Sequence, residues 1–133
     1  MAFPNSILRR FPIHRYFDVV GSFRSITRFL SSDSIIMADP SVCKVIPAFQ
    51  GRVVSVYWTS PLVHDDEQRG RDSERFFAIT TSADERRQII ARYGVTHILY
   101  QVGTLPSAVR ELLCEVAKEL TDVNGIILMK VKR

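Results

Sequence analysis

Residues 82–102, SADERRQIIARYGVTHILYQV, decide the fold of this 133-residue chain. Ser82 followed by Glu85 predicts a capping box, in which each side chain accepts a hydrogen bond from a free backbone N–H at the start of a helix. Gly94 predicts the left-handed stop of that helix. The apolar, β-branched run 95–102 is typical of a strand that is covered on both faces. A helix followed at once by a buried strand is half of an α/β repeat.

Apolar patterning along the rest of the chain predicts further strands and helices. β-Branched and apolar runs predict strands at residues 34–38, 52–58, 96–102 and 126–131. Helical spacing of apolar residues and a proline at position 40 predict helices at residues 16–30, 41–45 and 106–120. The polar segment 59–73 is predicted to be a surface loop. Basic residues at the end of the last strand predict that this strand forms an edge of the sheet.

The order of these elements predicts an α/β fold. We expect a small, mostly parallel four-stranded sheet that is flanked by helices in Rossmann-like or flavodoxin-like layering. Right-handed crossovers favour the strand order 2-1-3-4, and the last strand can run in either direction. Residues 1–15 are predicted to form a basic irregular arm, and residues 16–133 a single α/β domain.

The positive charge of the chain is concentrated near its start. Residues 1–30 contain five Arg and one Asp, which accounts for the whole net charge of +4. Subtracting these from the totals of 18 basic and 14 acidic residues leaves 13 of each sign in residues 31–133. A basic arm suits the phosphates of lipid headgroups or of nucleic acid, so a membrane surface is one expected partner, although a solvated arginine-rich lead-in is the favoured interpretation. Nucleic acid is the weaker alternative, because the rest of the chain lacks aromatic residues interleaved with basic ones.

Cysteine usage and the apolar runs limit the class of protein. Cys43 and Cys114 are far apart and have apolar neighbours, which predicts buried free thiols and argues against a disulfide framework or a zinc site. No apolar run reaches the roughly 18 residues that a membrane span needs. Arg9, Arg10 and Arg15 interrupt the apolar core that a signal peptide requires. These features predict a cytoplasmic protein if the chain is free-standing.

The residues that usually carry out catalysis are not arranged for it here. His64, Asp65, Asp66 and Glu67 form the densest group of metal-ligand types, but adjacent loop residues rarely converge on one ion, so neither a metal nor a cofactor is expected. His97, inside a predicted strand, is expected to be a hydrogen-bonded core histidine. The sequence has neither a nucleophile elbow nor a glycine-rich phosphate loop after a strand. A non-catalytic role is therefore favoured over an enzyme.

The carboxyl ends of parallel strands form the usual ligand crevice of an α/β sheet. By that rule six residues would gather at one edge: Asp39, Trp58, Thr59, Ser60, Gly103 and Thr104. Asp39 would accept hydrogen bonds from sugar hydroxyls, and Trp58 would stack on a sugar or nucleotide ring. In the alternative that the sequence favours, Asp39 caps the short helix and Trp58 lies in the core. A free-standing ligand-binding protein or enzyme that uses this crevice is the second hypothesis for function.

Short motifs spread over residues 34–101 resemble those of a known family. They are Ala38-Asp39-Pro40, Ile46-Pro47-Ala48, Gly51-Arg52, Phe76-Phe77 and Tyr93-Gly94-Val95. The arrangement resembles the soluble C-terminal domain of multi-spanning bacterial membrane proteins related to lipid-linked-sugar glycosyltransferases. The motifs describe turns and packing, and residues 34–101 are roughly half of the chain.

The resemblance implies a fold, a location and a class of role. It implies an α/β domain that follows the last membrane helix, lies outside the cytoplasm and acts as a binding or interaction module. Taken with the basic arm and the crevice, it gives two classes of expected partner, a membrane surface or membrane protein and a sugar-like small molecule. The family's catalytic carboxylates lie in a membrane loop that this chain does not contain, so no catalytic residue is implied. The chain also differs from the family at Tyr57 and Trp58, where a Gly-His pair is common.

Overall fold

The computed structural model describes residues 21, 24–39, 52–54 and 66–132, and the strands among them form one mixed five-stranded sheet in the order β2-β1-β3-β5-β4. β1 pairs in parallel with β2 and β3, whereas β5 pairs in antiparallel with β3 and β4. The strands are β1 (Ile35–Ala38), β2 (Arg52–Val53), β3 (His97–Gln101), β4 (Ala117–Val123) and β5 (Ile126–Val131).

The sheet confirms the α/β class and corrects its finer description. The four predicted strands that are described lie in the predicted order, but the prediction of a mostly parallel four-stranded sheet is wrong, because the two longest ladders are antiparallel. Rossmann-like or flavodoxin-like parallel layering therefore does not extend to the β3-β5-β4 half. β5 is not an edge, since it lies between β3 and β4.

The fifth strand arises where a helix was predicted. Helix α5 (Ser107–Leu113) ends seven residues before the predicted limit of 120, and β4 begins at Ala117. Asn124 and Gly125, with φ angles of 53° and 82°, form a two-residue turn that lets Val123 pair with Ile126. Positive φ at both central residues matches the twist of a hairpin. The resulting ladder to β5 pairs one side of the backbone of residues 117–123 and overrides their helical spacing.

The second correction concerns the predicted loop 59–73. Helix α3 (Asp66–Phe76) occupies its last part, while residues 55–65 lie outside the described chain. Pairs four residues apart support this polar helix: Gln68 donates to Asp72 at 2.9 Å, and Arg71 lies 3.9 Å from Glu67. Phe76 and Phe77 are buried and anchor the end of the helix in the core.

Helix α4 (Ala83–Tyr93) begins and ends as the sequence predicts. The Ser82 hydroxyl oxygen accepts a hydrogen bond from the Glu85 backbone N–H at 3.2 Å, and Gly94 has φ of 66°. The reciprocal bond of the capping box is replaced, because the Glu85 carboxylate accepts from Arg75 at 2.9 Å. The first turn of α4 is thereby tied to the last turn of α3.

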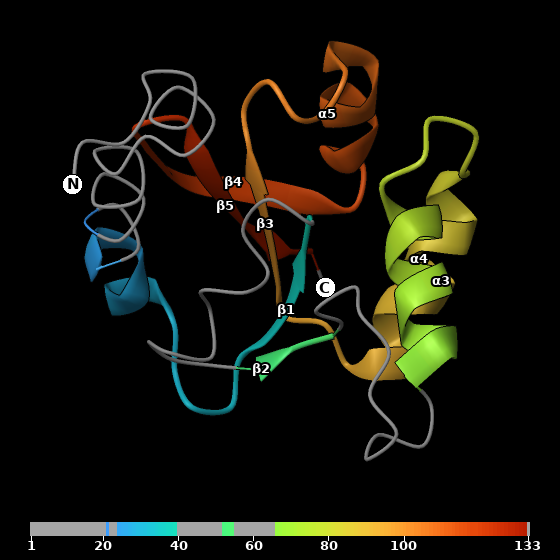
Figure 1. Ribbon diagram of the computed structural model, residues 1–133, viewed down its shortest axis with the longest axis horizontal. Helices are drawn as coiled ribbons and strands as arrows, with labels where there is room; N and C mark the ends of the chain where they lie inside the picture. The colour runs from blue at the N-terminus through green and yellow to red at the C-terminus, as the bar shows by residue number, and fades with distance from the viewer. Residues whose placement is uncertain (1–20, 22–23, 40–51, 55–65, 133) are drawn as a thin grey trace, which may run out of the picture.

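Helices cover both faces of the sheet (Figure 1). α3 and α4 lie side by side against one face, and the segment 24–30, which includes the 3-10 helix Thr27–Phe29, lies on the other. Two apolar clusters result, with Met37 and Ile98 in the first and Ile36 and Leu99 in the second. Residues 24–26 are helical, as predicted, whereas the predicted elements at 16–20, 41–45 and 55–58 lie outside the described residues. Within the described part of the chain, no helix is long and apolar enough to cross a membrane.

Candidate functional site

Asp39 connects the carboxyl ends of two neighbouring parallel strands. It follows directly after β1 and is only 1% exposed. Its Oδ2 accepts from the Gln101 backbone N–H at 3.0 Å and from the Thr104 hydroxyl at 2.8 Å. Its own N–H donates to the carbonyl of Leu99 at 3.1 Å. The carboxylate thus ties the end of β1 to the turn that follows β3.

The turn after β3 presents Thr104 to solvent. The Thr104 N–H donates to the carbonyl of Gln101 at 3.2 Å, and Gly103 has φ of 95° at the third position. That geometry favours glycine because a Cβ at positive φ is strained. The Thr104 hydroxyl is exposed and has one proton, shared between Asp39 Oδ2 and the Gln101 carbonyl at 2.6 Å. Its remaining lone pairs can accept from a ligand hydroxyl or amide.

The structure brings together the part of the predicted crevice that it describes. Asp39, Gly103 and Thr104 meet at one edge of the sheet, as the strand-end rule predicts. Trp58, Thr59 and Ser60 lie outside the described residues, as does the short helix that Asp39 was expected to cap. Ligand binding at this edge remains a prediction.

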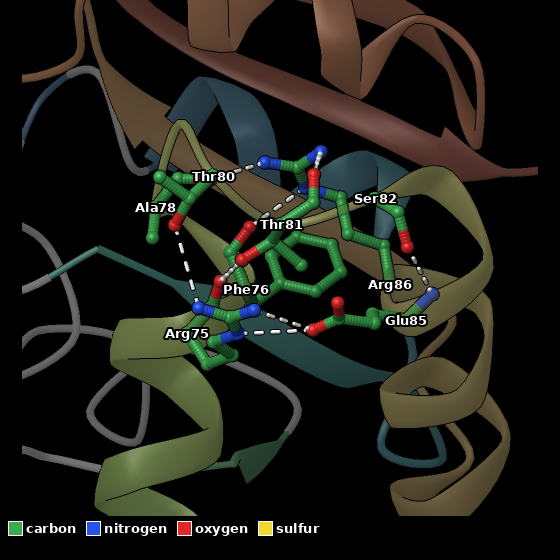
Figure 2. Close-up of polar contacts among 8 residues, drawn as sticks. All are labelled: Arg75, Phe76, Ala78, Thr80, Thr81, Ser82, Glu85 and Arg86. Carbon is green, nitrogen blue, oxygen red and sulfur yellow. Dashed lines mark hydrogen bonds and ion pairs between the residues drawn. The ribbon is translucent and has the colours of Figure 1, made fainter.

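Arg86 forms a second polar centre, which the sequence analysis missed. Its side chain is fully buried and donates to three backbone carbonyls of the α3–α4 connection (Figure 2). The bonds run to Phe76 at 2.8 Å, to Thr81 at 2.7 Å and to Ala78 at 2.6 Å. The Thr81 hydroxyl closes the same connection by donating to the carbonyl of Arg75. The guanidinium group therefore fixes the conformation of residues 76–82.

The buried charge of Arg86 is stabilised by dipoles and by distant carboxylates. Burial lowers the pKa of Arg86, and the charges of Glu115 and Glu85 act in the opposite direction. Its acceptors lie at and just beyond the carboxyl end of α3, where the helix dipole is negative. Five N–H donors in a planar fork suit several carbonyls at once. The position is structural, since every contact described for it is made within the domain.

A third polar cluster connects α3 to α4 through Asp72. This carboxylate accepts from Gln68 at 2.9 Å, from Arg92 at 2.8 Å and from the Tyr93 hydroxyl. The Arg69 guanidinium lies over the ring of Tyr93, 5.2 Å from its centroid. The sequence signal is weak: only the Gln68–Asp72 spacing of four residues indicates it.

The pKa values of Asp72 and Tyr93 are shifted in opposite directions. Burial raises the pKa of Asp72, but hydrogen bonds from Tyr93, Gln68 and Arg92 outweigh it, so the net pKa lies below its ordinary value. Burial and the Asp72 carboxylate raise the pKa of Tyr93 to about 12. At neutral pH the carboxylate is ionised and the phenol is protonated. The cluster therefore packs the two helices together and does not exchange protons.

His97 is a hydrogen-bonded core histidine, as predicted. It is 7% exposed, and its Nδ1 lies 2.8 Å from the Thr96 hydroxyl. Lys130 is its direct partner on β5. Burial and the positive charge of Lys130 both lower the pKa of His97. The imidazole is therefore neutral at pH 7.

We expect His97 to make the domain less stable as the pH falls below about 6.5. The unfolded chain then binds a proton that the folded state resists, because the pKa of His97 is lowered on folding. Stability should rise with pH through the folded pKa and level off above the unfolded value. Urea denaturation of wild type and His97→Gln between pH 5 and 8 checks this. The difference between their unfolding free energies must change with pH, and a constant difference would contradict the prediction.

The remaining sequence candidates do not form a site in the described residues. No group of three or more His, Cys, Asp or Glu side chains there is placed to hold a metal ion. His64 and Asp65 lie outside the described part, and Glu67 is exposed on α3. The prediction that Cys114 is buried is wrong: α5 ends at Leu113, so the cysteine falls in an exposed turn. Cys43 is not among the described residues.

Comparison with known proteins gives a likeness of fold. No protein-family model matches the chain, and no curated protein matches it. Among solved structures, the chain is similar to the C-terminal globular domain of an oligosaccharyltransferase from Archaeoglobus fulgidus, with a TM-score of 0.51 and 12% sequence identity. The superposition covers 77% of this chain and 87% of that chain. At this identity the likeness concerns the fold alone.

Proposed function

We propose that this chain is a non-catalytic α/β binding or interaction domain that works beside a membrane glycosyltransferase-like protein outside the cytoplasm. The observation that carries the proposal is the fold shared with a globular domain of an oligosaccharyltransferase over 87% of that domain. The short motifs of residues 34–101, which resemble the soluble domain of multi-spanning bacterial relatives, support the same assignment. A domain of this kind contributes binding and positioning, whereas the chemistry belongs to the membrane portion.

The polar groups at the ends of β1 and β3 support a more specific role in binding a small molecule. Thr104 supplies an exposed hydroxyl, and the buried Asp39 carboxylate holds that hydroxyl in place. Acceptors on a rigid strand end suit the hydroxyls of a sugar or of a nucleotide ribose. We therefore include sugar or nucleotide binding at this edge as the second candidate function.

Binding without turnover is the expected result for both roles. Thermal unfolding of the full chain would be followed with sugars, sugar phosphates and nucleotides, and each ligand would then be recovered and analysed by mass spectrometry. A ligand at 100 times its dissociation constant should stabilise the domain by about 2.7 kcal/mol. The recovered ligand should be unchanged.

Variants separate the crevice from the rest of the surface. Thr104→Ala should weaken the stabilisation, whereas Thr80→Ala, which removes an exposed hydroxyl from the α3–α4 connection, should not. Conversion of more ligand than there is protein would contradict the non-catalytic role. If a ligand stabilised both variants equally, the ligand would bind somewhere other than the edge at Thr104.

A further inference from the structure

Three basic residues occupy a single row across the antiparallel half of the sheet. Lys118 on β4 is paired with Lys130 on β5, and Lys130 is paired with His97 on β3. Directly opposed residues in a ladder project from the same face of the sheet. His97 is in turn paired with Ile36, which belongs to the apolar cluster on the face opposite α3 and α4. We call Lys118, Lys130 and His97 the basic row.

The β4–β5 hairpin separates its charges by face. Glu119 is paired with Met129 and Asp122 with Ile127, and both of these partners belong to the cluster under α3, α4 and α5. The carboxylates of β4 therefore project from the face opposite the basic row. The hairpin is acidic on its helix-covered face and basic on the other.

The lysines of the basic row differ from the arginines of α3 and α4 in their ion pairing. Four ion pairs engage arginines of α3 and α4 with carboxylates, namely Arg71–Glu67, Arg75–Glu85, Arg87–Asp84 and Arg92–Asp72. Lys118 and Lys130 are exposed, and no ion pair joins either of them to a carboxylate within the described residues. Like charges directly opposite each other destabilise a ladder. An anion that bridges the two ammonium groups would remove that repulsion.

We propose that the two exposed lysines of the basic row, Lys118 and Lys130, bind a phosphate group. Neighbouring strands lie about 4.8 Å apart, so two flexible lysine side chains on one row can reach one tetrahedral anion. His97 is paired with Lys130 but is only 7% exposed, so it reports on binding beside it and does not supply charge to the site. This site lies apart from the Asp39 and Thr104 edge and does not depend on it.

The test is a titration of the full chain with inorganic phosphate, followed by NMR and compared with sodium chloride at equal ionic strength. Phosphate should shift the resonances of His97, Lys118 and Lys130 in a saturable way, whereas chloride should not. The variant Lys118→Gln/Lys130→Gln should bind phosphate about tenfold more weakly or worse. It should fold normally, because both side chains are exposed and their mutual repulsion is lost. Shifts confined to other parts of the chain, or unchanged affinity in this variant, would overturn the proposal.

A matched variant controls for net charge. Arg71→Gln/Arg87→Gln removes the same two charges from exposed positions on the helices. It should bind phosphate as tightly as wild type. An equal loss of affinity in both double variants would overturn the proposal, because it would show a response to total charge alone.

Vesicles identify the source of the phosphate. Vesicles of phosphatidylcholine with and without phosphatidylglycerol would be sedimented with each variant, all of which retain the arginine-rich residues 1–30. A lipid headgroup as ligand predicts weaker binding to anionic vesicles for the lysine variant than for the arginine variant. Equal vesicle binding together with a lysine-dependent response to inorganic phosphate supports a free phosphate. If the lysine variant keeps both the response to inorganic phosphate and the binding to anionic vesicles, the proposal is overturned. That outcome does not depend on the result of the sugar titrations.

Discussion

Replacing Arg86 with Met is expected to lower the free energy of unfolding by about 3 to 5 kcal/mol. Methionine fills part of the buried volume but removes the donor to the carbonyls of Phe76 and Thr81, while the Ala78 carbonyl keeps a hydrogen bond from the Thr81 N–H at 3.3 Å. Each buried acceptor that loses its partner costs about 1 to 3 kcal/mol. The loss should be smaller than the sum of three, because Ala78 is half-buried and water can reach its carbonyl. Urea denaturation followed by circular dichroism measures the change.

Two further variants test whether the three hydrogen bonds of Arg86 account for the loss of stability. Arg86→Lys keeps the charge but has a single nitrogen, so its loss of stability should be intermediate. Arg87→Met removes the neighbouring arginine, whose ion pair with Asp84 joins side chains that are 57% and 86% exposed. Such a pair is worth about 0.5 kcal/mol or less. If Arg86→Met were as stable as Arg87→Met, residues 76–82 would not depend on the guanidinium group.

The spacing of residues in α4 contains part of the signal for Arg86. Position 86 lies three residues before Ile89 and seven before Tyr93, so it falls on the apolar face of the helix. A charged residue on that face indicates a buried hydrogen-bonding role. The acceptors could not be predicted, because they lie at the end of α3 and in the connection that follows it, and most of that helix was predicted to be a loop.

The sequence predicts which strands exist better than it predicts their direction. The apolar runs of β1, β3 and β5 indicate buried strands and give their order, but an apolar run has no information about which way a strand points. The Asn124-Gly125 turn was the available signal for a hairpin. The helical spacing of the preceding apolar residues outweighed this hairpin signal. The residues that fit a helical stripe are Val109, Leu113, Val116 and Leu120. Of these, Leu120 is 37% exposed in the structure.

The two surface regions differ in how far the sequence could predict them. Asp39 and Thr104 meet because β1 and β3 are parallel neighbours, so the strand-end rule applies to them. Lys118 and Lys130 are brought together by the register of an antiparallel hairpin. Without β4 in the prediction, no spacing in the chain places these lysines opposite each other.

Replacing Asp72 with Asn is expected to lower the unfolding free energy by about 2 to 3 kcal/mol and to lower the pKa of Tyr93. Asparagine keeps the shape but removes the charge that accepts from Arg92 and Tyr93. Burial and the Asp72 charge raise the pKa of Tyr93 to about 12, so loss of the charge should return it part of the way toward 10. Ultraviolet absorbance or NMR titration of the phenol measures this change.

The stability lost in Asp72→Asn should itself depend on pH. The folded pKa of Asp72 lies below its ordinary value, so its contribution is present above about pH 3.9 and is lost as the pH falls through the folded pKa. Wild type and variant should therefore converge in acid. Asp84→Asn is the matched control, because Asp84 is exposed and pairs with Arg87 on the surface of the same helix. An unchanged Tyr93 titration in Asp72→Asn would contradict the prediction, because it would mean that burial alone raises the pKa of the phenol.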